Sequence, residues 1–209
     1  MADFTAVPVH TRTRFPLNLA VATLFTLAAS VCLWLAAFST PFIKRIYYLG
    51  INRQGGSTRF GTFGYCYGVE ETRCIPRDVG YRHDLIPNSE GLTGALILTP
   101  IAAGLAALAA GSLVVAWFRH RGAVVGFLLT AITTLTAVLS FVLALVAFVT
   151  AHHRASSMKF DPRYGAALWL HMVGVILLVL ALPFTLLAWL RQRKNAKQTV
   201  ITTTTSYRP

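Results

Sequence analysis

The chain has 209 residues, of which 55% are hydrophobic and 12% charged, and its formal net charge is +12 at pH 7. Soluble domains carry about twice that share of charged residues, roughly a quarter, so this composition excludes an ordinary soluble protein. The basic residues are scattered and flank apolar runs, which favours contact with lipid headgroups over nucleic-acid binding.

The first predicted element after a polar tail at 1–16 is an apolar run at 17–38. It is long enough to cross a bilayer, which takes about 20 helical residues. Basic residues before it and small residues near its end leave a cleaved signal peptide open as an alternative. Signal-peptide cores are usually about 7–15 residues long, so we favour a retained transmembrane helix.

Residues 39–94 form the longest polar stretch and are expected to be the first extracellular loop. Its aromatic and β-branched residues predict short strands in a hairpin, with the glycine pair 55–56 at a turn. Alternation through 60–67 places Phe63, Tyr65 and Tyr67 on one strand face and Cys66 on the other.

Two cysteines of this loop, Cys66 and Cys74, are expected to form a disulfide if the loop faces an oxidising compartment. The segment 68–73 can turn and bring the second cysteine back beside the first. Closing so small a ring contributes about 2.5 kcal/mol by the loop-entropy relation. Two free thiols or a metal site are the alternatives, but a metal needs two further ligands and His83 supplies at most one. We therefore expect no metal and no cofactor.

Three more apolar runs are long enough to span a membrane, at 95–118, 123–150 and 166–190, and none of them contains Asp, Glu, Lys or Arg. A tight turn at 119–122 and a second outer loop at 151–165 connect them. The sequence therefore predicts an all-α membrane protein, a bundle of four transmembrane helices with a small disulfide-stapled β-sheet in the first outer loop.

Small residues recur every four positions in the second run, at Ala103, Ala107 and Gly111. Such a stripe lets a neighbouring helix approach closely. We expect it to serve helix packing, either within this bundle or against a partner.

Charge places both termini in the cytoplasm, because basic residues concentrate beside the short connections that would lie inside. Arg119 and Arg121 crowd the tight turn, and a basic cluster expected to face lipid directly follows the fourth run. That cluster is Arg191, Arg193, Lys194 and Lys197. The rest of the tail, 191–209, is Thr-rich and is expected to be disordered.

A motif in the first loop begins at residue 61 and reads GTFGYC, followed by seven residues to the second cysteine and five more to a Gly-Tyr pair. This order resembles the signature of the fungal Sur-seven/PalI family, a branch of the claudin-like four-helix membrane proteins. The loop lacks the tryptophan of claudins, so it is more similar to the fungal branch. The motif residues are Gly61, Phe63, Gly64, Tyr65, Gly80 and Tyr81.

The resemblance implies a plasma-membrane protein, associated in some members with eisosome-type cortical patches, wall integrity and sporulation. In PalI members it implies ambient-pH signalling, although these often carry longer tails than this chain has. We expect a non-enzymatic organiser or accessory subunit. Its partners would be the bilayer and a membrane protein or a second copy, with cell-wall contact through the first loop as a further possibility.

Other functions have less support in the sequence. An accessory role in pH sensing would use His83, His152 and His153, all expected outside, because imidazole titrates in the relevant range. A channel or transporter would need ionisable groups in the membrane, and only His171 qualifies. No catalytic motif or paired acid and base indicates an enzyme.

Overall fold

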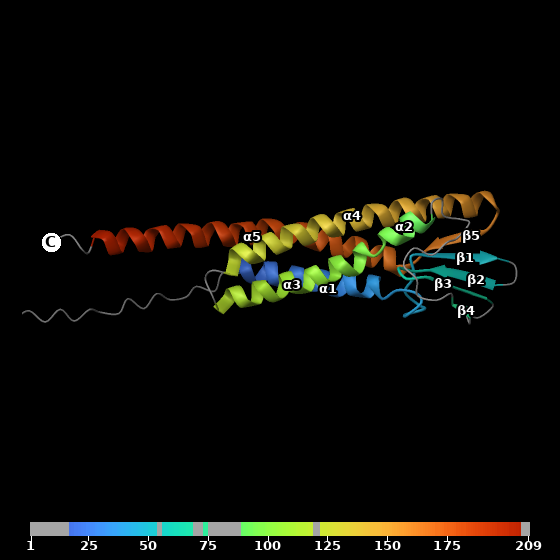
Figure 1. The fold of residues 1–209 in the computed structure, drawn as a ribbon, viewed down its shortest axis with the longest axis horizontal. Helices are drawn as coiled ribbons and strands as arrows, with labels where there is room; N and C mark the ends of the chain where they lie inside the picture. Colours follow the sequence, from blue (N-terminus) through green and yellow to red (C-terminus); the bar gives the residue numbers. More distant parts are fainter. Residues whose placement is uncertain (1–16, 54–55, 69–72, 75–88, 119–121, 206–209) are drawn as a thin grey trace, which may run out of the picture.

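The computed structural model describes residues 17–53, 56–68, 73–74, 89–118 and 122–205. Long helices form a bundle, and a small sheet lies at one end of it (Figure 1). We call this end the sheet end, and the opposite end, where the last helix finishes, the tail end.

Four helices build the bundle: α1 (Leu17–Ala37), α3 (Leu98–Phe118), α4 (Gly122–Ser157) and α5 (Ala166–Thr205). Each contains a stretch long and apolar enough to cross a membrane. Because these stretches lack charged residues, burial in lipid costs them little, and the helical backbone satisfies its own hydrogen bonds there. The predicted four-span bundle is confirmed.

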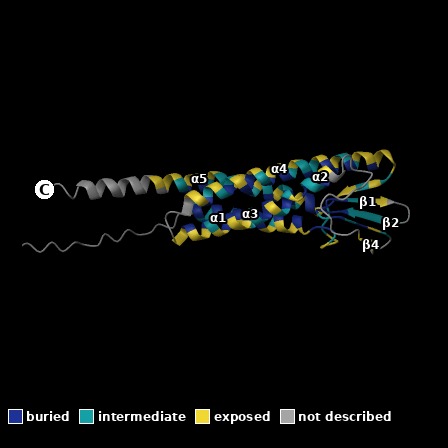
Figure 2. Cartoon of the chain, viewed as in Figure 1, coloured by how far each residue is buried: buried dark blue, intermediate teal, exposed yellow. Residues whose placement is uncertain are grey.

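The helices form a ring in which α1 and α4 each pack against α3 and α5. Their contact surfaces consist largely of small side chains, which allow close approach of helix backbones in a membrane. Many of the larger apolar side chains are exposed on the outside of the bundle, and Figure 2 shows exposed positions along the length of the helices. The fully buried alanines of the bundle include Ala22, Ala29, Ala36, Ala102, Ala103, Ala106, Ala109, Ala137 and Ala144.

The second span differs from the sequence prediction at its start. A short helix, α2 (Ser89–Ala95), is separated from α3 by a break at Leu96. Pro100 explains the break, because it lacks an N–H and its ring clashes with the carbonyl four residues earlier. The Leu96 carbonyl instead accepts a hydrogen bond from the Thr99 amide at 3.0 Å.

Helix α4 is longer than predicted and reaches Ser157 instead of ending near residue 150. Its 36 residues measure about 54 Å at 1.5 Å per residue, whereas the hydrocarbon core is about 30 Å thick. The last turns therefore extend past the membrane, where Ala151 and Ala155 are buried beneath the sheet. The predicted second loop is correspondingly shorter.

Helix α5 also differs from its prediction, because it continues through residues 191–205 of the tail expected to be disordered. The segment after Leu190 contains Arg, Gln, Lys and Ala, all of which have high helix propensity. These residues extend a helix that the membrane span has already nucleated.

The sheet has five antiparallel strands in the order β4-β3-β2-β1-β5. Four come from the predicted first loop, and β5 comes from the second, so one sheet joins both loops. The sequence did not predict β5. The strands are β1 (Leu49–Arg53), β2 (Gly56–Phe60), β3 (Tyr65–Gly68), β4 (Arg73–Cys74) and β5 (Asp161–Tyr164).

The alternation expected across 60–67 is interrupted, because β2 ends at Phe60 and a turn at 61–64 precedes β3. Phe63 therefore lies on the turn and not on a strand face. Within β3 the alternation holds, since Tyr65 pairs with Phe60 while Cys66 pairs with Arg59 on the opposite face.

One face of the sheet is buried against the extended end of α4. Leu49, Ile51 and Phe60 are almost fully inaccessible and pack in one cluster with Phe148 and Ala151. A small sheet has too little apolar surface to be stable alone. Its core is therefore shared with the helix, and the sheet and bundle form one folded unit.

Candidate interaction surface at the sheet end

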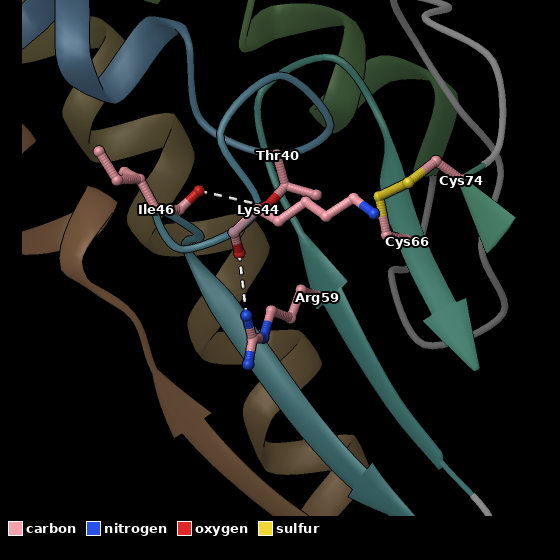
Figure 3. The surroundings of a disulfide bond; sticks show 6 residues. All are labelled: Thr40, Lys44, Ile46, Arg59, Cys66 and Cys74. Carbon is pink, nitrogen blue, oxygen red and sulfur yellow. Dashed lines mark hydrogen bonds between the residues drawn. A yellow bond between two sulfur atoms is a disulfide. The ribbon is translucent and has the colours of Figure 1, made fainter. Parts of the chain in front are cut away.

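The disulfide joins Cys66 of β3 to Cys74 of β4, as predicted (Figure 3). The two residues are direct partners in the strand register. Cys66 is fully buried, while Cys74 at the sheet edge is exposed. Because β4 has only two residues, its few ladder hydrogen bonds would hold it weakly, and the covalent link fixes this edge of the sheet.

The turn at 61–64 attaches the sheet to the end of α1. The Thr62 amide donates to the Ser39 hydroxyl at 3.1 Å, and the Thr62 hydroxyl donates to the Ala36 carbonyl at 3.1 Å. Gly61 lies so close to the Thr40 carbonyl that a Cβ atom would overlap it. Gly64 has φ of 152°, which glycine adopts readily. The first part of the predicted motif thus has a structural role, whereas Gly80 and Tyr81 lie outside the described residues.

A buried polar contact attaches the sheet to α5. Tyr48 directly precedes β1. Its hydroxyl lies 3.2 Å from Nδ1 of His171, and both side chains are fully buried. Burial raises the pKa of Tyr48 well above its ordinary range, so the phenol keeps its proton and can donate to the imidazole. The Tyr48 ring also stacks on Phe148 at 4.9 Å, and the His171 ring contacts Phe141 at 5.3 Å. This environment favours a packing role for His171 over an ion path.

The strand β5 is continuous with the start of α5, and its backbone lies against residues 47–48. The Gly165 amide donates to the Tyr48 carbonyl at 2.9 Å, and the Ala167 amide donates to the Tyr47 carbonyl at 3.0 Å. A side chain at Gly165 would overlap the Tyr47 carbonyl. The sheet is therefore held against α1, α4 and α5 together.

A family model for the SUR7/PalI family matches residues 19–181, well over half of the chain. The match runs from α1 into α5 and includes the whole sheet. The chain belongs to the SUR7/PalI family. It is a membrane protein of that family, in agreement with its four apolar spans. A search of curated protein sequences finds no match.

In this SUR7/PalI protein, aromatic and basic side chains are exposed at both edges of the sheet. Tyr67 on β3 pairs across the strands with Arg73 on β4, and both are exposed. At the opposite edge, Tyr164 is exposed beside Arg163, whose guanidinium forms an ion pair with Asp161 at 3.0 Å. Tyr and Arg are enriched among residues that dominate protein interfaces.

The histidines of the pH hypothesis are only partly located. His152 and His153 lie on the last turns of α4, and the His152 ring stacks on Tyr164 with centroids 4.6 Å apart. His153 is exposed. His83 lies outside the described residues.

One residue of the predicted α3 packing stripe packs within the bundle, and contact of the other two with a partner stays a prediction. Ala103 is buried in the bundle, but Ala107 and Gly111 are exposed on its outside. The surface of α3 that packs within the bundle lies about one residue away from the predicted stripe. It includes Ala102, Ala106 and Ala109. Apolar residues cover all sides of this helix, so spacing alone does not distinguish the lipid-facing side.

The predicted basic cluster lies on α5 at the end of its span, which reaches Arg191, and just beyond it. Arg191 and Arg193 are exposed, and the Arg193 guanidinium lies 5.0 Å from the centre of the Trp189 ring. The side chains of Lys194 and Lys197 are outside the described set. Among the residues whose placement is described, no three His, Cys, Asp or Glu side chains gather as metal ligands would.

Proposed function

We propose that this SUR7/PalI family member is a non-enzymatic plasma-membrane protein that organises membrane patches or serves as an accessory subunit. It acts by contact through the sheet, which faces outside, while both termini face the cytoplasm. Support for the orientation comes from the disulfide, which is stable in oxidising compartments, and from basic residues near the short connections.

The observation that carries this proposal is the exposed pair Tyr67 and Arg73 on a sheet held by a disulfide. Strand backbone that the disulfide already holds in place loses little conformational entropy on binding. The sheet is joined to α1 through Thr62, and to α5 and α4 through the contacts of Tyr48 with His171 and Phe148. A partner bound to the sheet would therefore be coupled to the position of the whole bundle in the membrane.

A test is the lateral mobility of the fluorescently tagged chain in its native membrane, measured by photobleaching recovery. Replacing Tyr67→Ala and Arg73→Ala together should speed recovery several-fold, because the contact that retains the chain is lost. The matched control is Arg154→Ala with Lys159→Ala, which changes two exposed basic residues, one on the last turn of α4 and one in the turn after it, and should leave recovery unchanged. Equal recovery for the Tyr67 and Arg73 variant and the unaltered chain would refute contact through this edge.

A second candidate function is an accessory role in ambient-pH sensing, favoured by the stacking of His152 on Tyr164 at the sheet edge. Replacing His83, His152 and His153 by Gln should then abolish the cellular response to alkaline medium. A response equal to that of the unaltered chain would exclude these histidines as the sensor.

A further inference from the structure

An apolar groove lies on the outer side of α1 at the sheet end, with a volume of about 370 Å³. Its aromatic side chains form a continuous row. Trp34 stacks on Phe38 with ring centres 5.2 Å apart, Phe38 contacts Phe42 at 5.7 Å, and Phe42 contacts Phe63 of the 61–64 turn at 5.8 Å. The groove is lined by Val31, Trp34, Leu35, Phe38, Phe42 and Ile43.

The groove crosses the boundary of the membrane span. The apolar span of α1 ends at Ala37, so Trp34 lies within its last turn and Phe42 lies beyond it. Aromatic rings are typical of this boundary, where lipid chains meet headgroups. A surface at this depth on the outside of the bundle is covered by lipid chains, and the groove gives one such chain a defined position.

Positive charge lies directly beside the groove. Lys44 and Arg45 follow the lining residue Ile43 and are exposed. Arg59 adds a third cation, because its guanidinium donates to the Lys44 carbonyl at 3.0 Å (Figure 3). The sequence contains no Asp or Glu between residues 17 and 68. Within the described residues, neither Lys44 nor Arg45 forms an ion pair.

We propose that this groove is a binding site for an anionic phospholipid of the leaflet at the sheet end. One acyl chain lies along the aromatic row, and the phosphate lies against Lys44 and Arg45. An apolar groove alone would accept any lipid chain, whereas the adjoining cations select a headgroup with net negative charge. Each Lys or Arg near an anionic lipid surface contributes about a fivefold preference.

Trp34 can report the occupant directly, because brominated acyl chains quench tryptophan on contact. The full chain with Trp117, Trp169 and Trp189 replaced by Phe is reconstituted into phosphatidylcholine bilayers containing phosphatidylglycerol. Bromine is carried either by phosphatidylglycerol or by an equal mole fraction of phosphatidylcholine. We expect brominated phosphatidylglycerol to quench Trp34 at least twofold more strongly, and high salt to reduce the difference.

The decisive variant is Lys44→Gln with Arg45→Gln. If each charge contributes about fivefold, this variant should lower the binding constant for phosphatidylglycerol relative to phosphatidylcholine by about 25-fold. The control Arg154→Gln with Lys159→Gln removes two exposed cations at the same end of the bundle, one on the last turn of α4 and one in the turn after it, and should leave quenching unchanged. Equal quenching by both brominated lipids in the unaltered groove would overturn the proposal, as would a preference that survives the Lys44 and Arg45 changes. Weak quenching by either lipid, together with a dimeric mass, would assign the groove to a second copy of the chain.

Discussion

Replacing Tyr48 with alanine is expected to lower the free energy of unfolding by about 3–5 kcal/mol, the range for large aromatic side chains in a core. Tyr48 is fully buried, stacks on Phe148 of α4 and contacts His171 of α5. Its removal leaves a cavity where the sheet meets two helices. The measurement is denaturant unfolding of the purified chain in mild detergent, followed by far-UV circular dichroism.

The polar contact within this site can be isolated with smaller changes. Tyr48→Phe keeps the ring but leaves the buried His171 Nδ1 without the Tyr48 hydroxyl, which should cost about 1–3 kcal/mol. Combining it with His171→Leu should cost less than the sum of the two single changes, because both polar partners are then removed. Tyr67→Phe is the control, since the Tyr67 side chain is partly exposed. Strictly additive effects would contradict the coupling of Tyr48 and His171.

The raised pKa of Tyr48 also fixes the direction of its pH dependence. Burial holds the proton on the folded side chain, so the unfolded phenol, with a pKa of about 10, ionises first as the pH rises. The stability contributed by the neutral phenol is present below about pH 10 and is lost above it. Tyr48→Phe should remove this part of the alkaline loss of stability.

Gly61→Ala is expected to destabilise the attachment of the sheet to α1 by about 1–3 kcal/mol or more, the cost of overpacking. The added Cβ would overlap the Thr40 carbonyl, and backbone atoms cannot rotate aside as a flexible side chain can. The hydrogen bonds of Thr62 to Ser39 and Ala36 depend on the same approach. Faster proteolytic cleavage near residues 61–64, together with a lower unfolding midpoint, would show this loosening.

Gly104→Ala is the matched control for Gly61→Ala, because no atom lies within 4 Å of a Cβ at that position. Alanine has a higher helix propensity than glycine, so this change should be neutral or slightly stabilising. Gly165→Ala should behave like Gly61→Ala, since its Cβ would overlap the Tyr47 carbonyl. If Gly61→Ala unfolds at the same denaturant concentration as Gly104→Ala, the close approach of the turn to α1 is not a constraint.

The features that the sequence predicted correctly have strong local signals. Four long runs without charged residues indicate membrane spans, and the cysteines of β3 and β4 are separated by a segment long enough to turn. The alternation around Cys66 also predicted correctly which side chains of β3 share a face. These features depend on neighbouring residues, which a sequence displays directly.

The features that the sequence did not predict depend on distant contacts. Strand β5 has four residues and includes Pro162, so it lacks the alternating pattern of a strand and forms because β1 offers an open edge. The Tyr48 and His171 contact joins residues 123 positions apart. The extension of α4 carries His152 and His153, whose polarity resembled a loop, although Ala151 and Ala155 at helical spacing are buried by the sheet.

The most direct test of the central claim is the accessibility of Cys66 and Cys74 in intact cells that express the chain with Cys32→Ser. After treatment with an impermeant reductant, a membrane-impermeant maleimide should label Cys74, which is exposed at the edge of the sheet. A cysteine introduced by Arg193→Cys at the tail end, in a chain without the other cysteines, should be labelled only after permeabilisation. If the maleimide labels the Arg193→Cys position in intact cells and does not label the sheet cysteines, the sheet faces the cytoplasm and the account is contradicted.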